Sequence, residues 1–123
     1  MNLSKTITDA ELEIMKILWR EGVPISSTEI RLELKETKNW EKSTVLTLLR
    51  RLADKGIITV VKGDPSSYTP NIKEEDYIAE QTQDMLDRLY GGSVKNLVAA
   101  LCDSKLTEQD IIELKNYFME EGK

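Results

Sequence analysis

A run of hydroxyl and cationic side chains lies between Trp40 and Gly56, in the segment WEKSTVLTLLRRLADKG. Plotted as a helix at about 100° per residue, this segment places its hydroxyl and guanidinium groups on one side and its apolar side chains on the other. Hydroxyl and guanidinium groups are side-chain groups that read base edges and hold phosphates. The pattern therefore predicts a DNA-contacting helix. Its candidate residues are Lys42, Ser43, Thr44, Thr47, Arg50 and Arg51.

An ordinary amphipathic helix is the alternative interpretation of this segment, because most charged helix faces only meet solvent. In both interpretations the apolar side faces the core, at the i, i+3, i+4, i+7, i+8 spacing. Gly56 is placed to end the helix in a left-handed conformation. The residues expected to face the core are Val45, Leu48, Leu49, Leu52 and Ala53.

Two capping boxes mark helices before this segment. Thr8–Glu11 and Ser26–Glu29 each place a hydroxyl residue three positions before a glutamate, a pattern in which side chains satisfy the free N–H groups of a first helical turn. The first helix is expected to stop at Gly22 and the second at about Glu36. The chain thus begins with two helices that lead into the cationic third one.

A β-hairpin is predicted directly after the cationic helix. Ile57–Val61 is β-branched throughout, Gly63–Ser66 has the composition of a turn, and Ser67–Thr69 can return as a second strand. Three small helices followed by a two-stranded hairpin form the winged helix-turn-helix arrangement, in which the third helix enters the major groove. Lys62, near the hairpin tip, is a further candidate for phosphate contact.

The C-terminal part of the chain is predicted to form three short helices. Lys73–Tyr90 is amphipathic, Gly91–Gly92 interrupts the pattern, and apolar stripes follow in Val94–Cys102 and after Thr107. The expected fold class is therefore mainly α with a small β-hairpin. We expect a winged-helix DNA-binding domain in residues 1–72 and a helical dimerisation domain in residues 73–123.

Dimerisation is predicted from the small size of this C-terminal segment. Three short helices without a disulfide or a metal bury little surface, whereas a second copy would cover their apolar stripes, and two-fold homodimers are the commonest assembly. The alternative is that the segment folds back on its own N-terminal domain. In a dimer, two recognition helices would read the two halves of a palindrome. The residues expected at the interface are Ile78, Met85, Leu86, Leu89, Leu97, Val98, Leu101, Ile111, Leu114 and Phe118.

Composition narrows the function class. Histidine is absent and Cys102 is the one cysteine, which disfavours His-based catalysis and Cys/His metal sites. Cys102 lies in an apolar run and is expected to be a small core residue. No nucleophile, phosphate-loop or cofactor motif is visible, so an enzyme, a cofactor and a small-molecule ligand are not expected. Met1–Thr8 lacks a signal-peptide core and no apolar run could span a membrane, which predicts a cytoplasmic protein.

The net charge of −5 opposes nucleic-acid binding only as an average. Residues 1–72 contain 11 Lys and Arg against 10 Asp and Glu, whereas residues 73–123 contain 6 against 12. A local basic face can exist within an acidic average when the acidic charge is concentrated elsewhere. The overall charge gives no support of its own to DNA binding.

Four segments of the chain follow the order and spacing of a known family. They are ITDAELEIMKILW from Ile7, W-x₃-T-V-x-T-L-L-x-R-L-x-x-K-G from Trp40, YTPNI from Tyr68 and LYGGSVKNLV from Leu89. Together they resemble the BlaI/MecI penicillinase-repressor family over about residues 7–120. The resemblance implies a homodimeric winged-helix repressor that binds palindromic operators before β-lactamase or penicillin-binding-protein genes. It also implies inactivation by proteolysis, triggered by a membrane sensor that a β-lactam has acylated. By position, Thr44, Thr47 and Arg51 match DNA-facing residues of the family.

The chain departs from the family pattern at several positions. Ser43 stands where the family often has Lys, and Leu46 stands where Arg or Gln is usual. Glu41-Lys42 replaces a Ser-Pro helix start. Because of these departures, the resemblance does not specify the operator sequence. Family cleavage falls at an Asn-Phe bond after the Gly-Gly break, where Ala100-Leu101 stands here as the candidate cleavage site. The cysteine cluster of related copper-responsive repressors is absent, which disfavours copper sensing.

Two function classes are carried forward. The first is a homodimeric transcriptional repressor of β-lactamase or other β-lactam-resistance genes, with double-stranded operator DNA and a membrane sensor-protease as partners. The second is a winged-helix protein-interaction module without sequence-specific DNA binding, in which Ser43, Thr47, Arg50 and Arg51 would only be solvated. DNA binding by the third-helix face distinguishes the two.

Overall fold

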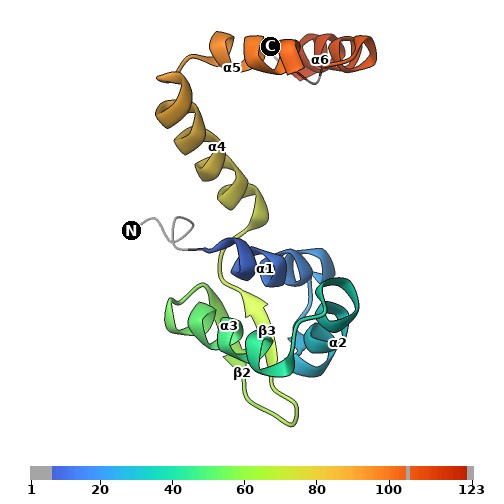
Figure 1. Ribbon diagram of the computed structural model, residues 1–123, viewed down its shortest axis with the longest axis vertical. Helices are drawn as coiled ribbons and strands as arrows, with labels where there is room; N and C mark the ends of the chain where they lie inside the picture. Colours follow the sequence, from blue (N-terminus) through green and yellow to red (C-terminus); the bar gives the residue numbers. More distant parts are fainter. Residues whose placement is uncertain (1–6, 105, 122–123) are drawn as a thin grey trace. The chain divides into compact units, whose positions relative to one another are not determined.

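Helices and three short strands make up most of the described part of the chain, residues 7–104 and 106–121 of a computed structural model (Figure 1). The remaining residues of the two expected domains, 1–6, 105 and 122–123, lie outside that part. The elements are α1 (Asp9–Glu21), β1 (Ile25–Ser26), α2 (Ser27–Lys38), α3 (Lys42–Asp54), β2 (Ile58–Val61), β3 (Ser67–Pro70), α4 (Glu74–Tyr90), α5 (Val94–Ser104) and α6 (Glu108–Glu121). They form two compact units, Met1–Gln81 and Thr82–Lys123. The predicted fold class, mainly helical with a small antiparallel sheet, is confirmed.

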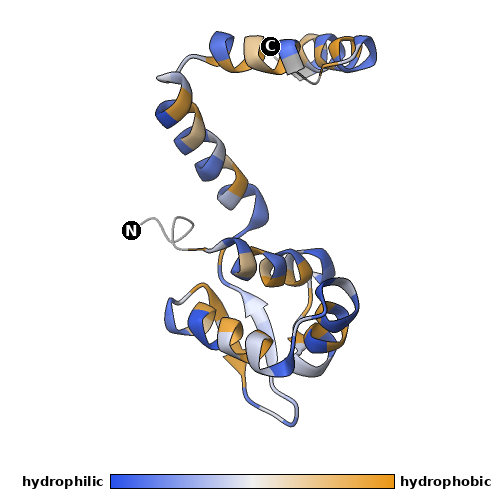
Figure 2. Ribbon diagram, in the orientation of Figure 1, coloured by the Kyte–Doolittle hydropathy of each residue, from blue (hydrophilic) through white to orange (hydrophobic). Residues whose placement is uncertain are grey.

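The first unit closes around one apolar core. Its three N-terminal helices each turn an apolar stripe inward, because residues three and four positions apart share one face of a helix (Figure 2). Burying one such side chain stabilises the fold by about 1.5–3 kcal/mol. The largest fully buried apolar side chains are Ile14, Met15, Leu18, Ile30, Leu34, Val45, Leu49, Leu52 and Ile57.

Local caps set the ends of these helices. The Thr8–Glu11 box is complete, since Thr8 Oγ1 accepts from Glu11 N at 3.2 Å and Thr8 N donates to Glu11 Oε1 at 2.9 Å. In the second box Ser26 Oγ accepts from Glu29 N at 3.1 Å, and the reciprocal side-chain bond is not formed among the described residues. Ser26 also belongs to β1, where it pairs with Ser67.

Two glycines provide the left-handed ends that the helices require. Gly22 caps α1 with a φ of 70°, and Gly56 follows α3 with a φ of 78°. The predicted stops at Gly22 and Gly56 are confirmed, because a residue without Cβ enters this conformation at little cost.

The sheet has a third strand that the sequence analysis missed. It was expected to be a two-stranded hairpin, but β1 pairs antiparallel with β3, so the strand order is β1-β3-β2. Ile25 lies opposite Tyr68, and Ser27 N donates to Ser66 O at 2.9 Å just beyond the strand. A strand of two residues carries no periodicity of its own, and its partner lies far along the chain. The extra strand joins the start of α2 to the hairpin.

The start of α4 packs within the first unit. Trp19 Nε1 donates to Ile72 O at 2.9 Å, and the centroids of the Trp19 and Tyr77 rings lie 5.5 Å apart. Burial raises the pKa of Tyr77, and the nearby charge of Asp9 raises it further. These contacts explain why this compact unit continues past the hairpin.

The second unit contains the end of α4 together with α5 and α6. Gly91 and Gly92 separate the first two helices in left-handed conformations, as the Gly-Gly break predicted. None of its described residues is buried, and hydrophobic segments recur along its helices (Figure 2). Cys102 was expected to lie in a core, but it is exposed. The expectation was wrong because an apolar stripe identifies one side of a helix without showing what covers it. Within the described ranges, no helix combines the length and the apolarity needed to cross a membrane.

Candidate DNA interface

α3 buries one side and exposes the other. The predicted core-facing residues Val45, Leu48, Leu49 and Leu52 are buried, and Ala53 is half-buried against them. On the opposite side Lys42, Ser43, Thr44, Arg50 and Arg51 are exposed and Thr47 is half-buried. The structure thus brings all six predicted α3 candidates onto one accessible surface, which is called the α3 face below.

Two shallow hollows border this face. One is lined by Ser43, Thr44, Thr47, Leu48 and Arg51. The other is lined by Glu41, Lys42, Ser43 and Leu46. Ser43 borders both, so it lies on a ridge with a hydroxyl-rich and cationic hollow to one side and a partly apolar hollow to the other. A convex ridge of this kind can enter a groove of duplex DNA.

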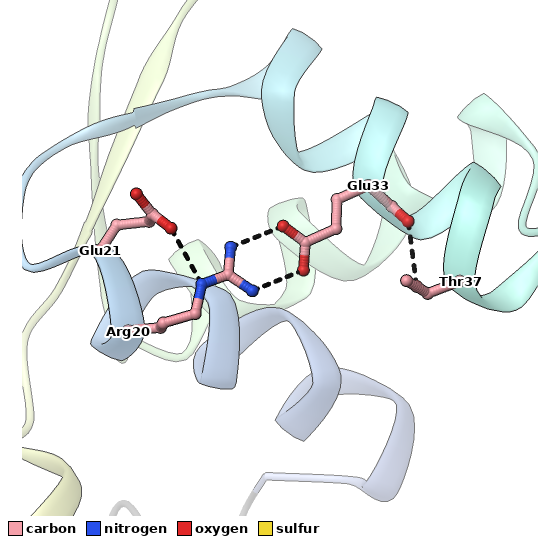
Figure 3. Close-up of polar contacts among 4 residues, drawn as sticks. All are labelled: Arg20, Glu21, Glu33 and Thr37. Atoms are coloured by element: carbon pink, nitrogen blue, oxygen red, sulfur yellow. Dashed lines mark hydrogen bonds and ion pairs between the residues drawn. The ribbon is translucent and has the colours of Figure 1, made fainter.

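Arg20 of α1 is neutralised by carboxylates of α1 and α2. Arg20 makes a bidentate ion pair with Glu33 of α2, at 2.8 and 2.6 Å, and its Nε donates to Glu21 at 2.9 Å (Figure 3). Glu33 O in turn accepts from Thr37 Oγ1 at 2.9 Å. The hydrogen bonds from Arg20 lower the pKa of Glu33, and those to Glu33 and Glu21 raise the pKa of Arg20. This network ties α1 to α2 and neutralises the charge of Arg20.

Other lysines of the first two helices are paired in the same way. Lys16 and Lys38 both lie 3.5 Å from carboxylate oxygens of Glu13. Lys35 lies 3.1 Å from Glu41, the residue that precedes α3. Glu41 makes no side-chain cap bond, so its side chain leaves the first-turn N–H groups of α3 uncapped.

The cations of the α3 face and the hairpin differ from Arg20 and from the paired lysines of α1 and α2. Lys42, Arg50, Arg51 and Lys62 form no ion pair with any of the described residues. Their charge is therefore available to an external anion. Unpaired cations are the groups that replace the counterions of DNA phosphates. A chain with net charge −5 thus keeps a local cationic surface.

Side-chain bonds fix the hairpin beside the end of α3. Asn71 Oδ1 accepts from Thr59 Oγ1 at 2.7 Å, and Asn71 Nδ2 donates to Gly56 O at 2.9 Å. Lys62 is exposed in the loop that follows β2. The base of the hairpin is thus tied to the residue that terminates α3.

A buried ion pair anchors the end of α3 to the start of α1. Lys55 Nζ lies 2.7 Å from Glu11 Oε1, and Glu11 is only 1% exposed. Burial raises the pKa of Glu11, but hydrogen bonds from Lys55 and Thr8 outweigh it and hold that pKa below its usual range. The cap role of Glu11 was predicted from the sequence, whereas its ion pair with Lys55 was not. A signal was present, because Glu11 begins the stripe that continues through Ile14, Met15 and Leu18.

Similarity to known proteins extends over most of the chain. The family model described as penicillinase repressor matches residues 7–120. The chain belongs to the penicillinase repressor family. The penicillinase repressor of Bacillus licheniformis is 38% identical over 110 residues, which are 88% of this chain and 85% of that protein. The resemblance predicted from four sequence segments is confirmed.

Two solved structures of penicillinase repressors share the fold. The DNA-binding domain of the repressor BlaI in solution is 42% identical, with a TM-score of 0.54, over 58% of this chain and 88% of that one. The monomeric form of Bacillus licheniformis BlaI, in complex with the blaP half-operator, is 44% identical with a TM-score of 0.51 over the same shares. The winged-helix architecture predicted from the order of elements is therefore confirmed.

Arg31 is a cation of this winged helix that the sequence analysis missed. It lies on α2, half-buried, and its Nε is buried without a hydrogen-bond partner among the described residues. It also forms no ion pair there. Arg31 stands one turn before Lys35, which contacts Glu41, so it belongs to the side of α2 that meets the start of α3. The spacing of Arg31 and Lys35 was the available signal.

Proposed function

We propose that this member of the penicillinase repressor family represses transcription by holding operator DNA against the α3 face and the hairpin. The observation that carries the proposal is the division of its cations. Those of α1 and most of α2 are neutralised, whereas Lys42, Arg50, Arg51 and Lys62 form no ion pair within the described part of the chain. The complex of the related BlaI with the blaP half-operator supports duplex DNA as the partner.

The residues divide into two roles in this proposal. The unpaired cations, including Arg31, hold phosphates and position the protein on the duplex. Ser43, Thr44 and Thr47 lie on the N-terminal half of α3, the part of a recognition helix that reaches base edges. Hydroxyls both donate and accept hydrogen bonds, so they can read either edge of a base pair. The Glu11–Lys55 pair and Asn71 keep α3 and the hairpin in fixed positions before DNA binds.

Dimerisation through residues 73–123 is the second part of the proposal. The second unit has no buried residue among those described, while its helices carry many accessible apolar side chains. Monomeric proteins rarely leave large apolar patches uncovered. A two-fold homodimer would cover them and present two α3 faces to a palindromic operator. Of the predicted interface residues, Ile78, Leu89, Val98, Leu101, Ile111, Leu114 and Phe118 are exposed, and Met85, Leu86 and Leu97 are half-buried.

Control of β-lactam-resistance genes is the third part. The family resemblance supports inactivation through a membrane sensor-protease that cuts the Ala100-Leu101 bond in the cytoplasm, where operator DNA is found. This bond lies within α5, with Leu101 exposed and Ala100 half-buried. Cleavage would separate α6 from the DNA-binding domain. Each half would then lose the effective concentration that the tether provides.

A gel-shift assay with duplexes from the protein's own promoter region tests the DNA-binding face. Arg51→Ala should weaken binding to all duplexes about tenfold or more, the cost of one charged contact. Thr47→Ala should change the preference among operators more than the affinity. Arg20→Ala is the matched control, because Arg20 is already satisfied by Glu33 and Glu21. If Arg51→Ala and Thr47→Ala both bind like the unaltered protein, the protein-interaction alternative is favoured instead.

A further inference from the structure

Leu46 is an accessible apolar side chain on the otherwise polar α3 face. It is 36% exposed, whereas the other long apolar side chains of α3 are buried in the core. On the helix it lies beside Lys42, Ser43 and Arg50, at spacings of three or four residues. The side chain therefore stays partly in water unless an external apolar group covers it.

The hollow beside Leu46 indicates where such a group would lie. Its lining consists of Leu46 with Glu41, Lys42 and Ser43, all at the N-terminal end of α3. Long side chains on a helix lean toward its N-terminus, so Leu46 covers the turn before its own Cα. That turn belongs to the half of a recognition helix that reaches base edges.

The major groove offers one kind of apolar group at this depth. Thymine presents its C5 methyl there, whereas guanine, cytosine and adenine present hydrogen-bond donors and acceptors. An aliphatic side chain against a donor or acceptor would remove water without replacing its hydrogen bond, which costs affinity. An accessible aliphatic side chain at this place would therefore favour thymine.

We propose that Leu46 determines operator specificity by packing against the C5 methyl of one thymine in each half-site. This inference rests on the proposed DNA-binding function and identifies a base that the α3 face selects. Ser43, on the adjacent ridge, is placed to contact a neighbouring base edge, and Lys42 to contact the flanking phosphate.

Replacement of thymine by uracil tests the proposal, because uracil lacks only the methyl group. Operator duplexes are first obtained by footprinting the protein on its own promoter region. Each thymine of one half-site is then replaced in turn by deoxyuridine, and binding is measured by gel shift. At one position the replacement should weaken binding of the unaltered protein about fourfold, the value of one buried methyl-sized group. The other replacements should have no comparable effect.

Two protein variants complete the test. The Leu46→Ala variant should bind the thymine duplex about fourfold more weakly than the unaltered protein does. It should bind the thymine and deoxyuridine duplexes with equal affinity. Leu32→Ala is the matched control, since Leu32 is 66% exposed on α2 and should retain the full methyl dependence. Both changes place a strong helix former at an accessible helical position, and circular dichroism checks that both variants fold.

The outcomes separate this inference from the function on which it rests. Specific binding without methyl dependence, or methyl dependence that survives in Leu46→Ala, overturns the role of Leu46 and leaves the repressor function intact. Failure of the unaltered protein to bind any promoter duplex refutes the proposed function, and the inference with it.

Discussion

The buried ion pair between Glu11 and Lys55 leads to a quantitative prediction. Glu11 is 1% exposed and Lys55 has a side-chain exposure of 31%, with 2.7 Å between Nζ and Oε1. Glu11 Oε1 also accepts from Thr8 N at 2.9 Å, whereas Oε2 is buried without a hydrogen-bond partner among the described residues. The carboxylate therefore depends on Lys55 for its countercharge, and the two single substitutions should differ in cost.

Lys55→Met leaves a buried carboxylate without a countercharge. Removing one partner of a buried pair costs about 3–5 kcal/mol. Because Lys55 is partly exposed, solvent screens the pair, and we expect a loss of about 2–3 kcal/mol of unfolding free energy. Glu11→Gln keeps the side-chain shape and the bond to Thr8, and it leaves a lysine that can reach water, so its cost should be about 1–2 kcal/mol. The coupling in a double-mutant cycle should be about 1–2 kcal/mol.

Urea denaturation followed by tryptophan fluorescence measures this coupling. Trp19 and Trp40, the two tryptophans of the chain, both pack against the core of the first unit, so their signal follows its unfolding. The matched control is the pair Lys35–Glu41, whose side chains are 53% and 74% exposed and whose coupling should be about 0–0.5 kcal/mol. A Glu11–Lys55 coupling no larger than that of the control would refute the reasoning.

The same pair predicts how stability depends on pH. The pKa of Glu11 is lower in the folded protein than its ordinary value, so the unfolded state binds more protons in acid. Its contribution is present above about pH 4.3, the usual glutamate pKa, and is lost as the pH falls through the lowered value. Glu11→Gln should remove this part of the acid dependence. An unchanged pH profile of unfolding in that variant would contradict the prediction.

Three further predictions concern DNA binding and assembly. Arg31→Ala should weaken binding to all duplexes and reduce the slope of log affinity against log salt by about 1, measured by gel shift; a change confined to one operator sequence would contradict a phosphate contact. Phe118→Asp should convert a dimer to a monomer in sedimentation equilibrium, because it places a charge in the apolar surface of α6; an unchanged mass would show that α6 lies outside the interface. Truncation after Ala100 should convert the dimer to a monomer in solution and lower the operator affinity, and an unchanged association state together with an unchanged affinity would exclude release by cleavage.

The amphipathic pattern of α3 was predictable because it is local. Burial of Val45, Leu49 and Leu52 follows from their helical spacing, and Gly56 ends the helix by its own conformational freedom. The same reasoning placed the Thr8–Glu11 cap and the Gly-Gly break after α4. Each of these features depends on residues within a few positions of one another, so one segment contains all the information.

Other features depend on residues that are distant in sequence. Lys55 and Glu11 are 44 positions apart, and Arg20 meets Glu33 only because α1 packs on α2. Composition shows how many cations the chain has, but the packed structure decides which of them are neutralised. Arg50 and Arg51, for example, have no ion-pair partner among the residues that the structure describes.

The positions of the helices, their caps and their apolar stripes were thus determined by the sequence alone. These features depend on local backbone preferences and on the helical period. The tertiary structure decided the third strand, the exposure of Cys102 and the cationic character of the α3 face. The physical reason is that strand pairing, burial and charge neutralisation each need a partner, and only folding selects which distant residue that partner is.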